Sequence, residues 1–134
     1  MIGADTNILL RLGDEESPDE RDLARTFVRE HSGRVYVNEI VLVEFAWTLA
    51  RTFKKERGEV GDRISALLAA KEFVVARAAE VARALERYRS GRADFSDYLL
   101  AEINRSQGCS VTATFDVDAA RSEDVFVAVS QLAR

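Results

Sequence analysis

The stretch that decides the fold opens the chain and reads Met1-Ile2-Gly3-Ala4-Asp5-Thr6-Asn7-Ile8-Leu9-Leu10. Its apolar start predicts a short buried strand over residues 2–4, and Asp5 follows at the point where that strand should end. A lone aspartate there also fits an ordinary turn, because Asp, Thr and Asn side chains bond nearby backbone groups. Only the acids in the rest of the chain suggest a second interpretation of Asp5, as part of a metal site.

Three later acids also stand inside or beside apolar sequence: Glu44, Asp97 and Asp116. The helical neighbours of Glu44 are mostly apolar, so we expect a buried carboxylate that needs a cation or a hydrogen-bonded partner. Asp97 and Asp94 fall in a predicted first helical turn, where they also fit a cap and a complement to the helix dipole. Asp116 follows a predicted strand and also fits a turn, with Asp118 as its substitute if the register is shifted.

Four such acids predict a site for a divalent metal ion. Magnesium and manganese suit an all-oxygen set of ligands, because both are hard cations that bind carboxylates and retain water. An ion held in this way can activate water and neutralise a phosphoryl oxygen. The sequence therefore favours metal-dependent hydrolysis of RNA or DNA.

The strands expected from the apolar runs are separated by helices, which favours a mostly parallel sheet covered by helices. Ligand sites in such sheets lie beyond the carboxyl ends of the strands, where Asp5 and Asp116 would fall. The strands are expected at residues 2–4, 34–37, 72–75, 111–114 and 125–129. The helices are expected at residues 17–30, 38–54 with a stop near Gly58, 61–70, 78–89 and 94–107, with a further helical stretch at the end of the chain.

Size and composition predict one domain over residues 1–134, with 47% hydrophobic and 31% charged residues. Cys109 is the only cysteine, so it forms no disulfide within the chain, and we expect it to lie in the core. With no signal peptide or membrane span apparent, we expect a cytoplasmic protein. The net charge of -4 argues against a generally basic nucleic-acid binder, although Arg51, Lys54, Lys55 and Arg57 could guide a phosphate backbone.

Other chemistries find little support in the sequence. His31, the only histidine, falls at a predicted helix end and is interpreted as a cationic cap. No Gly-rich phosphate loop or nucleophile elbow is present. Trp47 and the phenylalanines occur at helical or strand spacing, so they are expected in the core rather than on a base-stacking surface.

The ordered set Asp5-Thr6-Asn7, Val43-Glu44, Asp94-Phe95-Ser96-Asp97 and Thr114-Phe115-Asp116 closely resembles the PIN-domain family, in particular its VapC-type toxins. The resemblance spans almost the entire chain. It implies a three-layer sandwich around a central, mostly parallel sheet of four to five short strands. It also implies a ribonuclease that uses Mg2+ or Mn2+, forms homodimers and is paired with a small antitoxin protein.

Residue by residue, the resemblance matches Asp5 and Asp97 to the principal metal ligands. Glu44 matches the second acid, Asp116 the fourth, and Asn7 and Thr114 the polar residues that support the acids. Asp94 and Asp118 stand as alternatives. Two other functions stay open: a non-catalytic α/β domain of this shape that binds a basic partner, and a PIN nuclease that processes RNA without an antitoxin.

Overall fold

The strands that the structure describes are short, and they pair in parallel. The computed structural model describes residues 1–122 and 124–132. Within them, β1 (Ile2–Gly3), β2 (Val35–Val37) and β3 (Phe73–Val75) form a sheet in the order β1-β2-β3, and β4 (Thr112–Thr114) pairs with β5 (Phe126–Ala128). The predicted α/β class, with parallel strands flanked by helices, is confirmed, and the strands pair in two small sheets.

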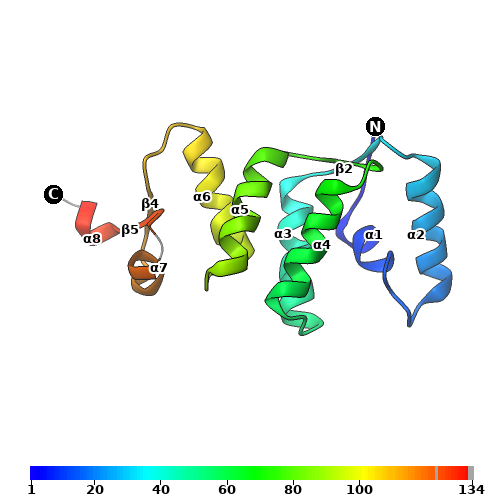
Figure 1. Ribbon diagram of the computed structural model, residues 1–134, viewed down its shortest axis with the longest axis horizontal. Helices are drawn as coiled ribbons and strands as arrows, with labels where there is room; N and C mark the ends of the chain where they lie inside the picture. The colour runs from blue at the N-terminus through cyan, green and yellow to red at the C-terminus, as the bar shows by residue number, and fades with distance from the viewer. Residues whose placement is uncertain (123, 133–134) are drawn as a thin grey trace. The chain divides into compact units, whose positions relative to one another are not determined.

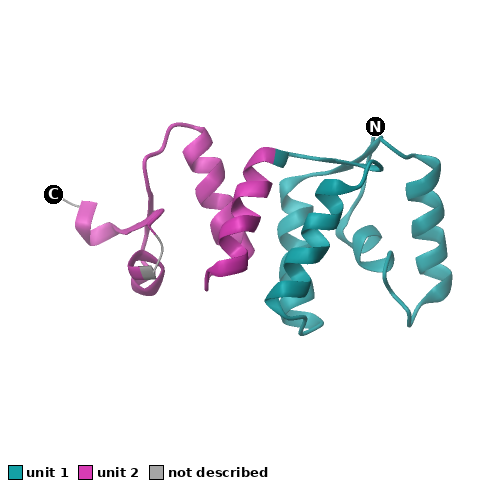
Figure 2. Ribbon diagram, viewed as in Figure 1, with its two compact units in different colours: residues 1–78 teal, residues 79–134 magenta. Residues whose placement is uncertain are grey.

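The two sheets belong to different units of the chain. Residues 1–78 and 79–134 form separate compact units (Figure 2), with the three-stranded sheet in unit 1 and the two-stranded sheet in unit 2. The interpretation of residues 1–134 as a single domain stays a prediction.

Unit 1 packs its helices around β2, whose Val35 and Val37 are fully buried. Helix α1 lies against both α2 and α3, and α4 contacts β3, as can be followed in Figure 1. The helices of this unit are α1 (Thr6–Arg11), α2 (Pro18–Glu30), α3 (Glu39–Trp47), the π-helix η1 (Thr48–Thr52) and α4 (Arg57–Ala69).

Unit 2 combines two longer helices with the second sheet. Its described helices are α5 (Ala78–Ser90), which begins at the last residue of unit 1, α6 (Phe95–Ser106), α7 (Val117–Ser122) and α8 (Val129–Leu132). Tyr98 and Leu99 of α6 and Val81 of α5 are among its buried side chains. A small apolar cluster joins Ala101 to Val125 and Phe126, so α6 also packs on the end of the second sheet.

Most elements begin where the sequence predicts. Asn38 caps α3, because its side-chain oxygen accepts the Val41 N–H at 2.9 Å, and His31 stands at the C-cap of α2. The helix end predicted at about residue 54 is confirmed, but the glycine stop near Gly58 is wrong. The helical stretch ends before Lys54, whose φ of 55° lies in the left-handed region, and Gly58 falls in the first turn of α4.

Helices α1 and α7 are not predicted by the sequence pattern. Each has six residues, which is too short for a periodic apolar stripe to show. Both follow directly after a strand and an aspartate, so the cap is the only local signal for them.

The expectation that the aromatic side chains and Cys109 lie in the core is only partly correct. Phe45, Phe95 and Phe126 are buried. Trp47, Phe53 and Phe115 are instead exposed, by 54%, 49% and 88%, and Cys109 is exposed. Helix α3 is apolar on every side, so spacing alone did not reveal which of its faces meets solvent.

No helix within residues 1–122 and 124–132 combines the length and the apolar character that crossing a bilayer requires.

Candidate functional site

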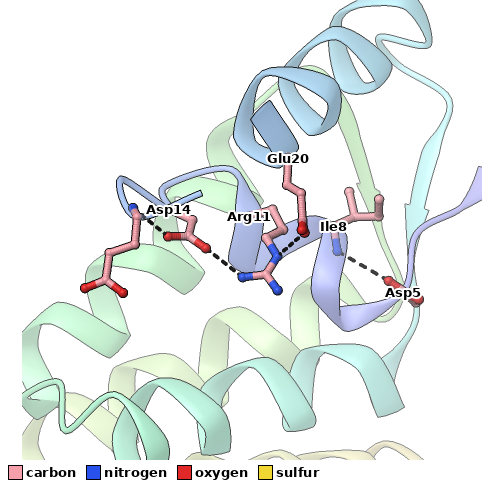
Figure 3. A network of polar contacts seen from close by, with 6 residues as sticks. Asp5, Ile8, Arg11, Asp14 and Glu20 are labelled. Carbon is pink, nitrogen blue, oxygen red and sulfur yellow. Dashed lines mark hydrogen bonds and ion pairs between the residues drawn. The ribbon is translucent and has the colours of Figure 1, made fainter. Parts of the chain in front are cut away.

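Asp5 stands immediately beyond the carboxyl end of β1. Its Oδ1 accepts the backbone N–H of Ile8 at 3.3 Å, so the carboxylate caps α1 (Figure 3). The side chain is exposed and shares with Asn7 a hollow of about 460 Å³ between α1 and α2. The capping role expected for such an aspartate is therefore real, and it leaves the second carboxylate oxygen without a described partner.

Arg11, a cation that lines this hollow, already forms ion pairs with two acids. Arg11 Nη1 donates to Asp14 Oδ2 at 2.6 Å, and Arg11 Nε lies 2.7 Å from Glu20 Oε2 (Figure 3). The hydrogen bond from Arg11 also lowers the pKa of Asp14. Among the described residues Asp5 belongs to no ion pair, so its negative charge remains available to a ligand.

Glu44 lies on the solvent side of α3, which corrects the expectation of a buried carboxylate. The helix buries Leu42, Phe45 and Ala46 on its other side, because these residues pack into the core of unit 1. Glu44 Oε1 accepts the hydroxyl of Thr6 at 3.1 Å. This contact links the residue after Asp5 to α3, so unit 1 brings the Asp5 motif and Glu44 into one neighbourhood.

Asp94 and Asp97 form the start of α6 in unit 2. Each side chain accepts the backbone N–H of the other residue, with 3.3 Å between Asp94 N and Asp97 Oδ2, which is a reciprocal capping box. The sequence predicted a cap here, and the structure shows that both aspartates take part in it.

Asp116 follows β4 and begins α7. Its Oδ1 accepts the N–H groups of Asp118 and Ala119 at 3.0 and 3.1 Å. Its own N–H donates to Thr114 Oγ1 at 3.0 Å, so Thr114 holds the backbone that carries this acid. The arrangement repeats that of Asp5: an aspartate after a parallel strand caps a six-residue helix.

The four candidate acids of unit 2 line a single hollow of about 640 Å³. Its walls are Arg92, Ala93, Asp94, Asp97, Asp116, Asp118, Ala119 and Arg121. The alternatives Asp94 and Asp118 thus lie beside the principal candidates Asp97 and Asp116, and both arginines stand at the same surface.

The surroundings of Asp97 in this hollow disfavour the ionised form of its carboxyl group. Partial burial raises its pKa, and the negative charges of Asp94 and Asp116 raise it further, against the opposing effect of the Asp94 N–H bond. A nearby cation would reverse these effects, because it favours the ionised form. The raised pKa marks Asp97 as an acid that lacks a positive partner.

Tyr98 supports the hollow and was not assigned a role from the sequence. Its fully buried ring places the hydroxyl to accept the N–H groups of Arg92 and Ala93, at 3.1 and 3.3 Å. Gly91 makes this approach possible, because a Cβ at that position would lie 1.8 Å from the Tyr98 hydroxyl oxygen. The only signal for it in the sequence is an aromatic residue directly after Asp97.

The donor set fits a hard divalent cation. The candidate ligands are carboxylates, and the carboxylates of Asp97 and Asp116 lie close enough to raise the pKa of Asp97. Within either unit, no three Asp, Glu, His or Cys side chains of the described residues gather closely enough to hold a metal ion by themselves. Water or substrate oxygens would therefore complete the coordination shell, as magnesium usually requires.

Parallel strands that end in acids, with a hollow of carboxylates after one of them, are an arrangement that suits a divalent metal ion and metal-dependent hydrolysis. A comparison with known protein families matches residues 3–124 to the PIN domain. The chain belongs to the PIN-domain family, whose members are generally nucleases that depend on divalent metal ions and act on RNA or DNA. A comparison with curated proteins gave no match.

Proposed function

We propose that this protein is an endoribonuclease that depends on Mg2+ or Mn2+ and forms the toxin of a VapBC-type toxin–antitoxin pair. Membership of the PIN-domain family supports the nuclease activity. The ordered set of acids that resembles VapC-type toxins supports the finer assignment. Its partners are RNA, a small antitoxin protein and a second copy of the chain.

The observation that carries the proposal is the lack of positive partners at the candidate acids. Among the described residues, none of Asp5, Glu44, Asp97 and Asp116 belongs to an ion pair. In unit 2 the charge of Asp116 raises the pKa of Asp97, and such repulsion between carboxylates is unfavourable for stability and useful for binding a metal ion.

In this proposal Asp5 and Asp97 bind the metal ion, and Glu44 and Asp116 complete the catalytic acids. The ion supplies an activated water and neutralises charge on the scissile phosphate. Thr6 fixes Glu44 through its 3.1 Å hydrogen bond, and Thr114 fixes the backbone of Asp116. Asn7 supports Asp5 from the first turn of α1.

The remaining polar residues of the unit 2 hollow act on the substrate and on the ligands. Arg92 and Arg121 line the hollow and attract the RNA phosphate that the acids alone would repel. Asp94 orients Asp97 through the capping box, and Asp118 is a further acid that lines the hollow.

The test is cleavage of a mixed pool of structured and single-stranded RNAs, with Mg2+, with Mn2+ and with a chelator. We expect metal-dependent cleavage that falls by at least about a hundredfold in Asp5→Asn and Asp97→Asn, since each removes charge from the metal site. Glu86→Gln is the matched control, because it removes one exposed charge from α5 outside the hollow.

Cleavage that survives both aspartate substitutions would overturn the assignment of the site. Absence of cleavage by a protein that binds Mn2+ would favour the non-catalytic alternative.

The toxin role has its own test in bacteria. Induced expression should arrest growth, Asp97→Asn should restore it, and co-expression of the small protein encoded beside the gene should also restore it. A chain that cleaves RNA without arresting growth would favour RNA processing without an antitoxin.

A further inference from the structure

Unit 1 contains a second hollow, of about 470 Å³, which none of the candidate acids lines. We call it the α2 hollow, because four of its seven residues belong to α2 or to the turn that follows α2 or α1. Its volume falls within the range of small-molecule sites. The residues that line it are Leu12, Arg25, Val28, Arg29, Ser32, Lys71 and Glu72.

The α2 hollow lies at the amino ends of the strands. Ser32 shortly precedes β2, and Lys71 and Glu72 precede β3, whereas Asp5 follows the carboxyl end of β1. Because the three strands are parallel, these two sets of residues belong to opposite edges of the sheet. The Gly33 N–H donates to Glu72 O at 3.0 Å, so the two turns at the hollow are tied to each other. The hollow is therefore separate from the candidate acids of unit 1.

Three cations line this hollow, namely Arg25, Arg29 and Lys71, and none of them belongs to an ion pair among the described residues. Arg25 Nε donates to Leu12 O at 2.9 Å, and Arg29 Nη2 donates to Thr26 Oγ1 at 3.3 Å, so both partners are uncharged. With Glu72 as the one acid among the residues that line it, the hollow has a net positive charge in a chain of net charge -4.

The folded chain leaves this positive charge uncompensated. Arg25 and Arg29 are four positions apart on α2, so they lie on one face of the helix, and like charges at this spacing repel each other. The acids of the same helix include Glu20 and Asp22, which pair with Arg11 and Arg21 instead. Uncompensated cations around a hollow favour the binding of an anion.

The remaining side chains indicate which kind of anion fits. Leu12 is half-buried and Val28 is buried, so apolar surface lies next to the cations. The Ser32 hydroxyl, which forms no hydrogen bond within the described residues, adds a donor. Guanidinium groups bind phosphate with paired hydrogen bonds, and a phosphate monoester carries a charge of about -1.5 to -2 near neutral pH.

We propose that the α2 hollow binds a small organic phosphate, that is, a phosphate monoester with an apolar body. The phosphate lies among Arg25, Arg29 and Lys71, and the apolar body packs on Leu12 and Val28. Binding here does not depend on the proposed nuclease activity, because the hollow contains none of the acids assigned to it.

A small ligand fits better than a protein or a nucleic acid. The centre of a protein interface is formed by large apolar and aromatic side chains, and none of the large hydrophobic side chains exposed in the described residues lines this hollow. Exposed Asp22 and Glu30 stand before and after the two arginines along α2, so they would repel a polyanion that extends beyond the hollow. A compact phosphate is held within it.

The test is a titration of the nitrogen-15-labelled chain with phenyl phosphate at pH 7.5 in a chelator, followed by NMR of the backbone amides. We expect saturable shifts at the amides of Ser32, Gly33 and Lys71. Inorganic phosphate should act on the same amides but bind about fivefold more weakly, because it lacks the apolar body. Phenol, which lacks the phosphate, should bind at least about tenfold more weakly.

Variants separate the α2 hollow from a general effect of charge. Arg25→Gln and Arg29→Gln should each weaken the binding of phenyl phosphate by about 5- to 20-fold, because each removes a charge-assisted hydrogen bond. Glu72→Gln should instead tighten it by about two- to fivefold, since an acid beside the phosphate is lost. Lys54→Gln, which removes an exposed cation of unit 1 outside the hollow, is the matched control and should bind as wild type. Unchanged melting temperatures establish that each variant is folded.

Three results would overturn the site. The first is the absence of saturable shifts at these amides, and the second is wild-type affinity in both arginine variants. The third is displacement of phenyl phosphate by a 2′-O-methylated ten-nucleotide RNA at an equal or lower concentration of phosphate groups, which would assign the hollow to nucleic acid. RNA cleavage is not measured in this titration, so each of these results leaves the proposed nuclease untouched.

Discussion

Helix α6 carries two carboxylates with opposite surroundings. Glu102 is 1% exposed and meets Nε of Arg83 at 3.1 Å and Nε of Arg87 at 3.4 Å. Asp97, in the first turn, belongs to no ion pair among the described residues and faces the charges of Asp94 and Asp116. The step of five positions from one to the other turns the helix by about 140°, so the two acids lie on different faces.

The contrast teaches that burial alone does not mark a functional acid. Glu102 is the more buried of the two, and two arginines compensate its charge. Asp97 reaches solvent, yet its neighbours are carboxylates and its pKa is raised. Lack of a compensating charge, rather than depth, distinguishes an acid that is available to a metal ion from one that holds the fold.

The largest effect on stability should come from removing the cations around Glu102. Arg83→Met with Arg87→Met leaves a buried carboxylate without a partner, which should destabilise the fold by about 3–5 kcal/mol at neutral pH. Adding Glu102→Met to this double variant should recover most of the loss. Urea unfolding measures both, and equal stability of the double and triple variants would show that the buried charge is not what matters.

A smaller loss should follow from Gly91→Ala. The new Cβ would meet the buried Tyr98 hydroxyl and lie 2.8 Å from the Arg87 carbonyl oxygen, so the loop that carries Asp94 must shift. Overpacking of this kind costs about 1–3 kcal/mol. Gly58→Ala is the control: its Cβ meets nothing within 4 Å in the first turn of α4, and it should stabilise slightly. Thermal melts that rank the two variants equally would contradict this account of Tyr98.

Asp97→Asn should instead increase the stability of the fold in the absence of metal. Because the pKa of Asp97 is raised in the fold, ionisation destabilises the wild type as pH rises from its unfolded pKa, about 3.9, through its folded pKa. The variant should therefore melt above the wild type at pH 7, and the difference should vanish below the unfolded pKa. Melting curves between pH 3 and 8 test this, and a lower melting temperature for the variant at pH 7 would refute it.

The smallest effect is expected at an exposed ion pair of the same length. Arg63 Nη2 lies 3.1 Å from Glu59 Oε2, but both side chains reach solvent. Glu59→Gln also removes the 3.7 Å pair between Glu59 and Lys55, and it should cost only about 0.6–1 kcal/mol, and less at high salt. A loss as large as that of the double arginine variant would show that burial does not separate the two pairs.

Much of the fold could be predicted from local sequence because its signals are local. Asn38 caps α3 as expected, and Pro18 stands at the first position of α2. The five strands also lie within or next to their predicted ranges. The short helices α1 and α7 were not predicted, because the only signal for them in the sequence is a capping aspartate. The helical stretch that starts with α3 ends close to the predicted residue 54, but a left-handed Lys54 follows it rather than the expected glycine.

Less of the candidate site than of the fold could be predicted from the sequence. The sequence predicted that Asp5 and Asp116 follow strands and that Asp97 lies in a helical first turn. It placed Glu44 in the core, because apolar neighbours on an all-round apolar helix do not reveal the exposed face. The Thr6–Glu44 hydrogen bond joins residues 38 positions apart, so only the folded chain reveals it.

The caps formed by Asp5 and Asp116 have a further consequence, which concerns entropy. In both, Oδ1 is already tied to backbone N–H groups, so the side chain has lost much of its rotational freedom before any ligand arrives. A cation that binds the remaining oxygen has less disorder to remove, and preorganised ligands bind more tightly for that reason. Each six-residue helix thus preorganises its leading acid for the metal ion that we propose.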